Sequence, residues 1–256
     1  MAAESVSSRV FRLLDAFSAT RPALSLSELS TVTGLPLSTT HRLVAELTTW
    51  GGLTRGADGR YRIGLRLLEI GSLSPGSLGL RERAMPFLED LYSATRQNVQ
   101  LAVRDELDAV YVERISARGA VNIVTRVGSR MPLHATGVGL ILLAHADTDV
   151  LERVFANPLE RFTEMTIGTT TRLREVLAAA RRDGYVISDR QIEMITQSIA
   201  APVRDTSNAV IAALSIVVPI ETDAHTLVPA VRAAGHGISR AMGWRPPAAA
   251  SRNHLR

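Results

Sequence analysis

Short polar side chains and an arginine gather within the first turn and a half of an expected helix. This set comprises Ser38, Thr39, His41 and Arg42. Short polar side chains allow a helix to lie close to the base edges of a DNA groove, while the longer arginine reaches further to a base or a phosphate. The positive end of the helix dipole also favours a nearby phosphate. The residue types and their order therefore indicate a helix that contacts DNA.

Three further arginines accompany a predicted β-hairpin. The segment LTRGADGRYRIG alternates apolar and polar residues on both sides of ADGR, which predicts two strands with Asp58 and Gly59 at the tip. Arg55, Arg60 and Arg62 lie on or near this hairpin. Such a hairpin beside a DNA-contacting helix is a wing, and its arginines are expected to bind the phosphate backbone or enter the minor groove.

Three predicted helices position these side chains. The first has apolar residues at three- and four-residue intervals and ends before Pro22. The second begins at Ser25, where Ser25 and Glu28 match the capping-box pattern, and ends at Gly34. The third follows at once, with Pro36 in its first turn. The inward-facing positions of the first and third helices are Val6, Val10, Leu13, Leu14, Phe17, Leu43, Val44 and Leu47.

The helices and the hairpin together predict a winged helix-turn-helix DNA-binding domain over residues 1–64. An alternative stays open, because helix-turn-helix geometry also serves for packing: a ligand-binding or protein-docking module with a degenerate helix-turn-helix. The dependence of binding on salt concentration distinguishes the DNA-binding domain from the docking module. Arginines that displace counterions from DNA make binding strongly dependent on ionic strength, whereas apolar docking is almost indifferent to it.

The composition limits the class of protein. With 256 residues, of which 46% are hydrophobic, the chain is long enough for two modest domains with buried cores. All 29 basic residues are arginine, yet the formal net charge is only +4, so charge is a weak sign of a polyanionic partner. Cysteine is absent, which excludes disulfides and thiolate chemistry.

The sequence predicts a soluble, cytoplasmic protein. Glu4 and Asp15 interrupt the apolar residues near the N-terminus, so this region lacks the apolar core of a signal peptide. The longest apolar run, residues 209–220, is too short for a membrane span and is rich in β-branched residues, which predicts a buried strand.

No residue pattern supports catalysis. The six histidines lack metal-ligand spacing, and the nucleophile-elbow, phosphate-loop and dinucleotide-binding motifs are missing. The acidic residues Asp105, Glu106 and Asp108 fall between two predicted strands and are expected to form a solvated turn, while His134 is expected to be structural. We therefore expect no catalytic residue, metal or cofactor, and a hydrolase or transferase is the least favoured alternative.

The remaining chain predicts a linker over residues 65–79 and a second domain over residues 80–244. The expected order is a helix interrupted near Pro86, three strands, a helix ending at Gly184, three strands and a final helix. The predicted strands are NVQLAVRD, LDAVYVERIS, AVNIVTRVG, YVISD, SIAAPVRD and AVIAALSIVV, and the predicted helices span residues 80–95, 173–184 and 224–242. This order indicates an α+β fold with a mixed antiparallel sheet, followed by a disordered tail at residues 245–256.

Several motifs match one family in order and spacing. They are GRYRIGLRLLEIG, RVGSRMPLHATGVG, RRDGY and AAPVRD. Over almost its whole length the sequence resembles the IclR-type bacterial transcriptional regulators. The resemblance implies a winged-helix DNA-binding domain, a linker helix and a C-terminal effector-binding domain of GAF-like α/β form. It also implies a homodimer or tetramer that binds a palindromic double-stranded DNA operator, as a repressor or as an activator.

The resemblance further implies where a small organic acid effector binds. Relatives hold it through backbone groups at a helix start and through side chains on three later strands. The matching residues here are Gly137, Val138, Ser188, Ser198, Ser215 and Val217. Ser188 stands where an acid is frequent, Ser198 where a cysteine is frequent, and Val217 where a serine is frequent. These departures imply a less polar pocket, which favours a larger, partly apolar or aromatic acid.

The resemblance also suggests how effector and operator are coupled. Effector binding is expected to close the pocket around the helix near Gly137 and to change the packing of the dimer or tetramer. Through residues 65–79 this would change the spacing of the two recognition helices, and with it the affinity for half-sites at a fixed separation.

Overall fold

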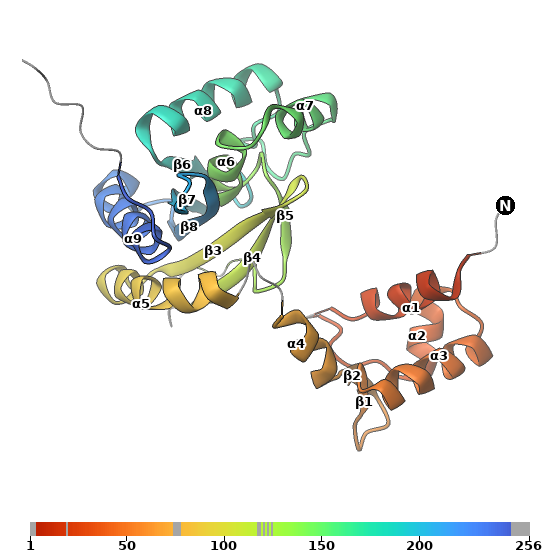
Figure 1. Ribbon diagram of the computed structural model, residues 1–256. Coiled ribbons are helices and arrows are strands. Elements are labelled where there is room, and N and C mark those ends of the chain that lie inside the picture. Colours follow the sequence, from red (N-terminus) through yellow and green to blue (C-terminus); the bar gives the residue numbers. More distant parts are fainter. Residues whose placement is uncertain are drawn as a thin grey trace, which may run out of the picture. The chain divides into compact units, whose positions relative to one another are not determined.

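A computed structural model describes residues 4–18, 20–73, 78–116, 119, 121, 123 and 125–246 (Figure 1). The chain divides into two compact units, residues 1–78 and 79–256. Part of the expected linker, residues 74–77, and most of the expected disordered tail, residues 247–256, lie outside the described residues. Among the helices described, none is long and apolar enough to cross a membrane.

The first unit is a winged helix-turn-helix, as predicted. Its elements in order are α1 (Val6–Asp15), α2 (Leu26–Thr33), α3 (Leu37–Trp50), β1 (Leu53–Arg55), β2 (Tyr61–Ile63) and α4 (Leu65–Gly71). Leu13, Leu29, Leu43 and Leu53 are fully buried and join the three first helices to the hairpin in one core. The hairpin is extended by a bridge between Leu24 and Tyr61, which ties the start of α2 to the wing.

Local sequence signals account for the ends of these elements. The capping box at the start of α2 is present, since the Ser25 hydroxyl accepts from the Glu28 amide and the Glu28 carboxylate accepts from the Ser25 amide. Gly34 ends α2 with a φ of 66°. Pro36 caps α3 and does not lie within its first turn. At the wing, Gly59 has a φ of 74°, a conformation that glycine adopts without strain.

The second unit is built on a six-stranded antiparallel sheet in the order β5-β4-β3-β8-β7-β6. This confirms the predicted α+β class with an antiparallel sheet. The strands are β3 (Asn98–Asp105), β4 (Asp108–Ile115), β5 (Arg130–Pro132), β6 (Val186–Asp189), β7 (Thr196–Arg204) and β8 (Val210–Pro219). The helices are α5 (Leu78–Thr95), α6 (Gly137–Ala144), α7 (Thr148–Ala156), α8 (Thr170–Asp183) and α9 (Val228–Ala241), the last preceded by the short 3₁₀ helix η1 (Ala224–Leu227).

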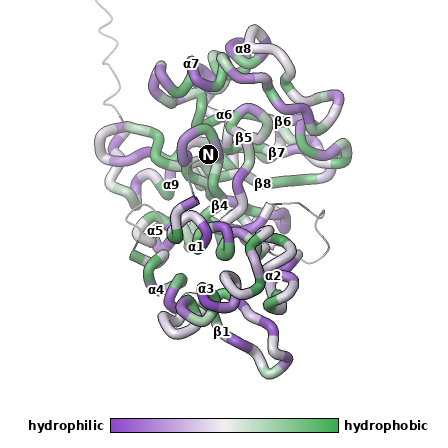
Figure 2. Tube along the Cα trace, turned by 90° about the vertical axis from the view of Figure 1, so that its right-hand side faces the viewer, coloured by the Kyte–Doolittle hydropathy of each residue, from purple (hydrophilic) through white to green (hydrophobic). Residues whose placement is uncertain are grey.

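Helices cover both faces of this sheet, and each face has its own core. Helices α6, α7 and α8 lie on one face, and α5 and α9 lie on the other (Figure 1). Because side chains alternate along a strand, Leu214 and Ile216 of β8 enter the core beneath α5 and α9, while Ala213 enters the core beneath α6. The tube of β8 is accordingly largely hydrophobic along its length (Figure 2).

The predicted interruption near Pro86 is wrong, because α5 continues through this residue. Proline lacks an amide hydrogen, so the carbonyl of Glu82 loses its helical partner. Both Glu82 and Pro86 are exposed, and water can therefore bind that carbonyl. On the opposite side of the helix, Ala84 and Leu88 are fully buried against the sheet and hold the helix in place.

The strand predicted over residues 120–128 is also wrong where the structure describes it. Residues 120, 122 and 124 lie outside the described set, and their described neighbours form no strand. Side chains from β3 and β4 hydrogen-bond to two backbone carbonyls of this segment. The Asn98 amide donates to the carbonyl of Val121, and the Arg114 guanidinium donates to the carbonyl of Thr125. The edge strand is β5 instead, which pairs with β4.

Candidate functional site

A cavity opens on the face of the sheet that α6 covers. Its empty volume is about 470 Å³, including its opening to solvent. Strands β3, β4, β6, β7 and β8 and the N-terminal end of α6 contribute to its walls. All six residues implied as an effector site line it, namely Gly137, Val138, Ser188, Ser198, Ser215 and Val217. Their contact with a ligand stays a prediction.

Strand register brings the four side chains of this set together. Ser188 of β6 lies opposite Ser198 of β7, and Ser198 lies opposite Val217 of β8, so the three form one row across the sheet. Ser215 precedes Val217 by two residues and therefore faces the same side. On its other flank Ser215 lies opposite Gln100 of β3.

The start of α6 lies against this row because it carries glycine. A Cβ on Gly137 would lie 2.6 Å from the Ser198 hydroxyl oxygen and 3.3 Å from the Ala200 Cβ. The Thr136 hydroxyl caps the helix by accepting from the Gly139 amide at 3.0 Å. Within the described chain, the amides of Gly137 and Val138 donate to no other group. These two amides, at the positive end of a helix, can bind an anion.

Two serine hydroxyls also remain available. Ser188 is 5% exposed, and neither its hydroxyl nor that of Ser198 makes a hydrogen bond to another described residue. The hydroxyl of Ser215 is engaged, because it donates to the Gln100 side chain at 3.4 Å. Gln100 in turn donates to the Thr125 hydroxyl.

Sequence reasoning did not identify Tyr111, Gln100 or Glu193, which also line the cavity. Burial raises the pKa of the Tyr111 hydroxyl to about 12, while a hydrogen bond with Thr136 acts in the opposite direction. The hydroxyl therefore stays protonated and can donate. One signal was present for Gln100, since it is a polar residue within an otherwise apolar stretch of strand.

The cavity contains few charges. Among the described residues that line it, none is an arginine or a histidine, and Glu193 is the one carboxylate. An anion in this cavity would be held by neutral donors. Among the described residues, no group of three or more histidines and carboxylates could hold a metal ion.

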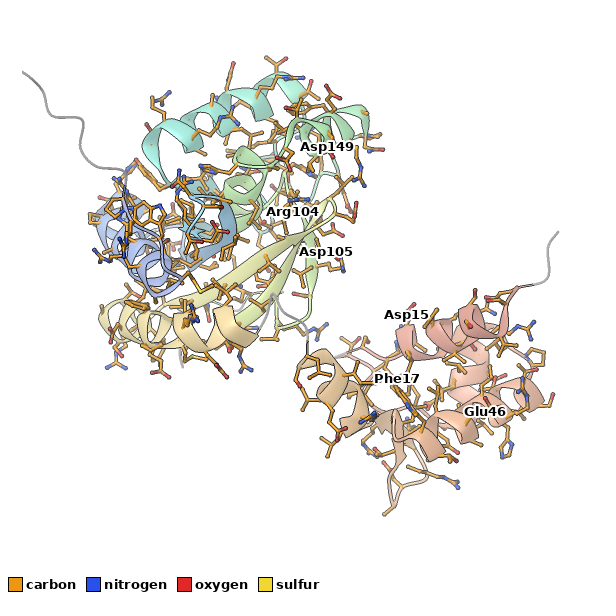
Figure 3. The ribbon with its side chains drawn as sticks, viewed as in Figure 1. Asp15, Phe17, Glu46, Arg104, Asp105 and Asp149 are labelled. Atoms are coloured by element: carbon orange, nitrogen blue, oxygen red, sulfur yellow. The ribbon has the colours of Figure 1, made fainter. Side chains whose placement is uncertain are left out.

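The acidic residues between β3 and β4 lie away from the cavity. Asp105 and Asp108 form ion pairs with Arg130, and Glu106 pairs with Arg153 at 2.7 Å. All three acids are accessible to solvent, in agreement with a solvated turn; Figure 3 labels Asp105 at the end of β3.

His134 has the structural role expected of it. It is 5% exposed, and its Nε2 lies 2.9 Å from the carbonyl oxygen of Glu160. This contact joins the chain ahead of α6 to the loop that follows α7.

The residues predicted to contact DNA lie on the outer side of α3 and on the wing. Ser38, His41 and Arg42 are exposed, and Thr39 is half-buried. Arg42 pairs with Glu46, which is labelled on α3 in Figure 3, at 2.9 Å. Both partners are well exposed, so the pair is weak enough for a phosphate or base to compete.

The three wing arginines differ in their partners. Arg60 donates to both oxygens of Glu28, at 2.8 and 3.2 Å, and so joins the wing to α2. Arg62 pairs with Asp58 at 2.6 Å, and this hydrogen bond, together with one from the Arg60 amide, lowers the pKa of Asp58 to about 2. The guanidinium of Arg55 lies over the ring of Tyr61 and has no acidic partner among the described residues. Arg55 is therefore the wing arginine most available to DNA.

Comparison with protein families matches both units. Residues 7–56 match the IclR helix-turn-helix domain, and residues 74–240 match the bacterial transcriptional regulator IclR C-terminal domain. Two curated relatives are the transcriptional regulators XynR of Escherichia coli and KipR of Bacillus subtilis. XynR is 31% identical over 92% of this chain and 96% of its own length, and KipR is 34% identical over 77% and 79%.

Solved structures give the same result. An IclR homolog from Microbacterium hydrocarbonoxydans, complexed with 4-hydroxybenzoate, is 38% identical, with a TM-score of 0.89 over 93% of this chain and 99% of that one. A putative transcriptional regulator from Rhodococcus sp. RHA1 is 27% identical, with a TM-score of 0.82 over 94% and 99%.

Proposed function

Because the chain belongs to the IclR family of bacterial transcriptional regulators, we propose that a small aromatic acid binds in the cavity and changes the affinity of the protein for its operator. The protein is a DNA-binding transcriptional regulator and, like its relatives, not an enzyme. The proposal concerns the identity of the effector and its consequence.

One observation supports an aromatic acid as the effector: the cavity combines unpaired neutral donors with apolar side chains. The amides of Gly137 and Val138 suit a carboxylate. Ile123, Ile192 and Val217 supply the apolar surface that a ring can cover. The 4-hydroxybenzoate complex of a 38% identical homolog supports the same class of ligand.

The regulator acts in this proposal as a cytoplasmic homodimer or tetramer on a palindromic operator. Ser38, Thr39, His41 and Arg42 contact the major groove, and the wing arginines, Arg55 foremost, contact the backbone. The acid changes operator affinity because it binds the DNA-competent and DNA-incompetent states of the protein unequally. Residues 65–79 transmit the difference.

The test uses the full-length protein and the DNA immediately upstream of its own gene, at two salt concentrations, with a panel of aromatic and short-chain acids. We expect tight binding that weakens steeply with salt and that an aromatic acid alters. Binding that only a short-chain acid alters would overturn the aromatic assignment. Binding indifferent to salt would instead favour a docking module with a degenerate helix-turn-helix.

A further inference from the structure

Glu193 is the one carboxylate among the described residues that line the cavity. It lies in the loop between β6 and β7, where its backbone carbonyl accepts from the Thr196 amide. The Glu193 side chain forms no ion pair or hydrogen bond with another described residue, and it is half-buried. A partly buried carboxylate without a partner is open to a hydrogen-bond donor from a ligand.

The register of β7 places Glu193 and the start of α6 toward different ends of the cavity. The Gly137 end of α6 lies over Ser198 and Ala200 of β7. Thr196 is the next residue of β7 on that face, roughly 7 Å further along the strand at the usual rise per residue, and Glu193 lies beyond it in the loop. A ligand that contacts both must therefore be longer than a short-chain acid.

The two ends offer opposite chemistry. At the α6 end, the amides of Gly137 and Val138 and the hydroxyls of Ser188 and Ser198 can all donate. Ser188 adds an independent sign of a ligand here, because the residue is only 5% exposed, lines the cavity and has a hydroxyl with no partner in the described chain. At the Glu193 end, a carboxylate can only accept and repels a second negative charge.

We propose that the effector is an aromatic acid that carries a hydrogen-bond donor on the ring, opposite its carboxylate, and that Glu193 selects this donor. The inference rests on the proposed function, since it requires an aromatic acid in the cavity. The ligand carboxylate lies at the start of α6, and a ring hydroxyl or amino group donates to Glu193. The reverse orientation places two carboxylates together and offers the donors at α6 only a neutral acceptor in place of a carboxylate.

The test compares three ligands of equal length on the full-length protein by calorimetry. They are 4-hydroxybenzoate and 4-aminobenzoate, which carry a donor, and 4-methylbenzoate, which does not. The wild-type protein is expected to bind the two donor ligands about tenfold or more tightly than 4-methylbenzoate, as expected for a hydrogen bond to a charged acceptor. In Glu193→Leu this preference is expected to disappear, while 4-methylbenzoate binds at least as well as before.

Two more variants test the charge of Glu193 and provide a control outside the cavity. Glu193→Gln keeps an acceptor but removes the charge, and should bind 4-methylbenzoate at least as tightly as the wild type while its preference for the donor ligands is reduced. Glu221→Gln removes an exposed acid outside the cavity and should leave all three affinities unchanged. A donor preference that persists in Glu193→Leu overturns the role of Glu193 alone. Failure of all three acids to bind overturns the aromatic effector and this inference with it.

Discussion

Gly137 lies so close to Ser198 in the cavity wall that a Cβ on Gly137 would lie 2.6 Å from the Ser198 hydroxyl oxygen. This contact brings the free amides at the start of α6 to the serine row on the sheet. The site therefore depends on the lack of a side chain at one position as much as on the hydroxyls at others.

We expect Gly137→Ala to lower the free energy of unfolding by about 1–3 kcal/mol, the usual cost of overpacking a close contact. The same change should weaken binding of the aromatic acid, because α6 must move away from the serines. Denaturant unfolding and calorimetry measure the two effects.

Two variants test the cause of that loss. Gly137→Ala combined with Ser198→Ala should recover part of the stability, because the clashing oxygen is gone. Gly79→Ala adds a methyl group where no atom lies within 4 Å, and should leave stability unchanged or slightly higher. Equal loss in the single and double variants would show that Ser198 is not the obstacle.

Arg42→Ala should abolish operator specificity while leaving effector affinity intact, because Arg42 is exposed on α3 and belongs to the other unit. Its ion pair with Glu46 is exposed, so unfolding should change by no more than about 0.5 kcal/mol. Footprinting measures operator specificity, and calorimetry measures effector affinity. The matched control is Arg172→Ala, which removes a similar exposed pair with Glu175 on α8. Loss of both functions in Arg42→Ala would contradict this division of roles.

Arg55→Ala should reduce the slope of log affinity against log salt by about 1, since one phosphate contact is lost. Stability should hardly change, because Arg55 has no acidic partner among the described residues.

Arg60→Ala should instead destabilise the winged helix-turn-helix by a few tenths to about 1 kcal/mol, because it breaks the pair with Glu28. If the salt slope fell in Arg60→Ala and not in Arg55→Ala, the assignment of the two arginines would be reversed.

Tyr111→Phe should weaken binding of the acid about tenfold, because we expect the protonated hydroxyl to donate to the ligand. Tyr111 itself should contribute no change in the effector affinity of the wild-type protein between about pH 6 and 9, since its pKa is raised to about 12 and even an ordinary tyrosine titrates near 10. Calorimetry across this range measures both. Tyr92→Phe, a change outside the cavity, is the control, and equal affinity in the Tyr111 variant and the wild type would exclude the hydroxyl as a ligand contact.

The raised pKa of Tyr111 also makes the free energy of unfolding depend on pH in the alkaline range. Between about pH 10 and 12 the unfolded chain has lost the Tyr111 proton and the folded protein keeps it, so stability falls as the pH rises through this interval. Tyr111→Phe should remove that part of the decrease.

Features fixed by nearby residues were predictable from the sequence. The capping box at Ser25 and Glu28, the stop at Gly34 and the hairpin around Asp58 and Gly59 all depend on interactions within a few residues. Each was predicted where it occurs, and the winged helix-turn-helix followed from them.

Features fixed by distant residues were not. The segment around Val121 alternates like a strand, but side chains of Asn98 and Arg114 bind its carbonyls. Pro86 looks like a helix break, but burial of Ala84 and Leu88 holds the helix together. Periodicity along the chain contains neither kind of information.

The cavity could be predicted from the sequence only in part. Its serines could be named because family motifs mark their positions. Glu193 could not, because it enters the cavity through the loop between β6 and β7, and its distance from α6 follows from the register of β7 beneath Gly137.

Because no arginine is among the described residues that line the cavity, we expect operator binding and effector binding to respond differently to ionic strength. Operator binding releases counterions and weakens as the surrounding ion concentration rises. An acid held in a partly buried site by amides and hydroxyls is screened much less. At raised salt concentration we therefore expect the protein to leave its operator while it retains its effector.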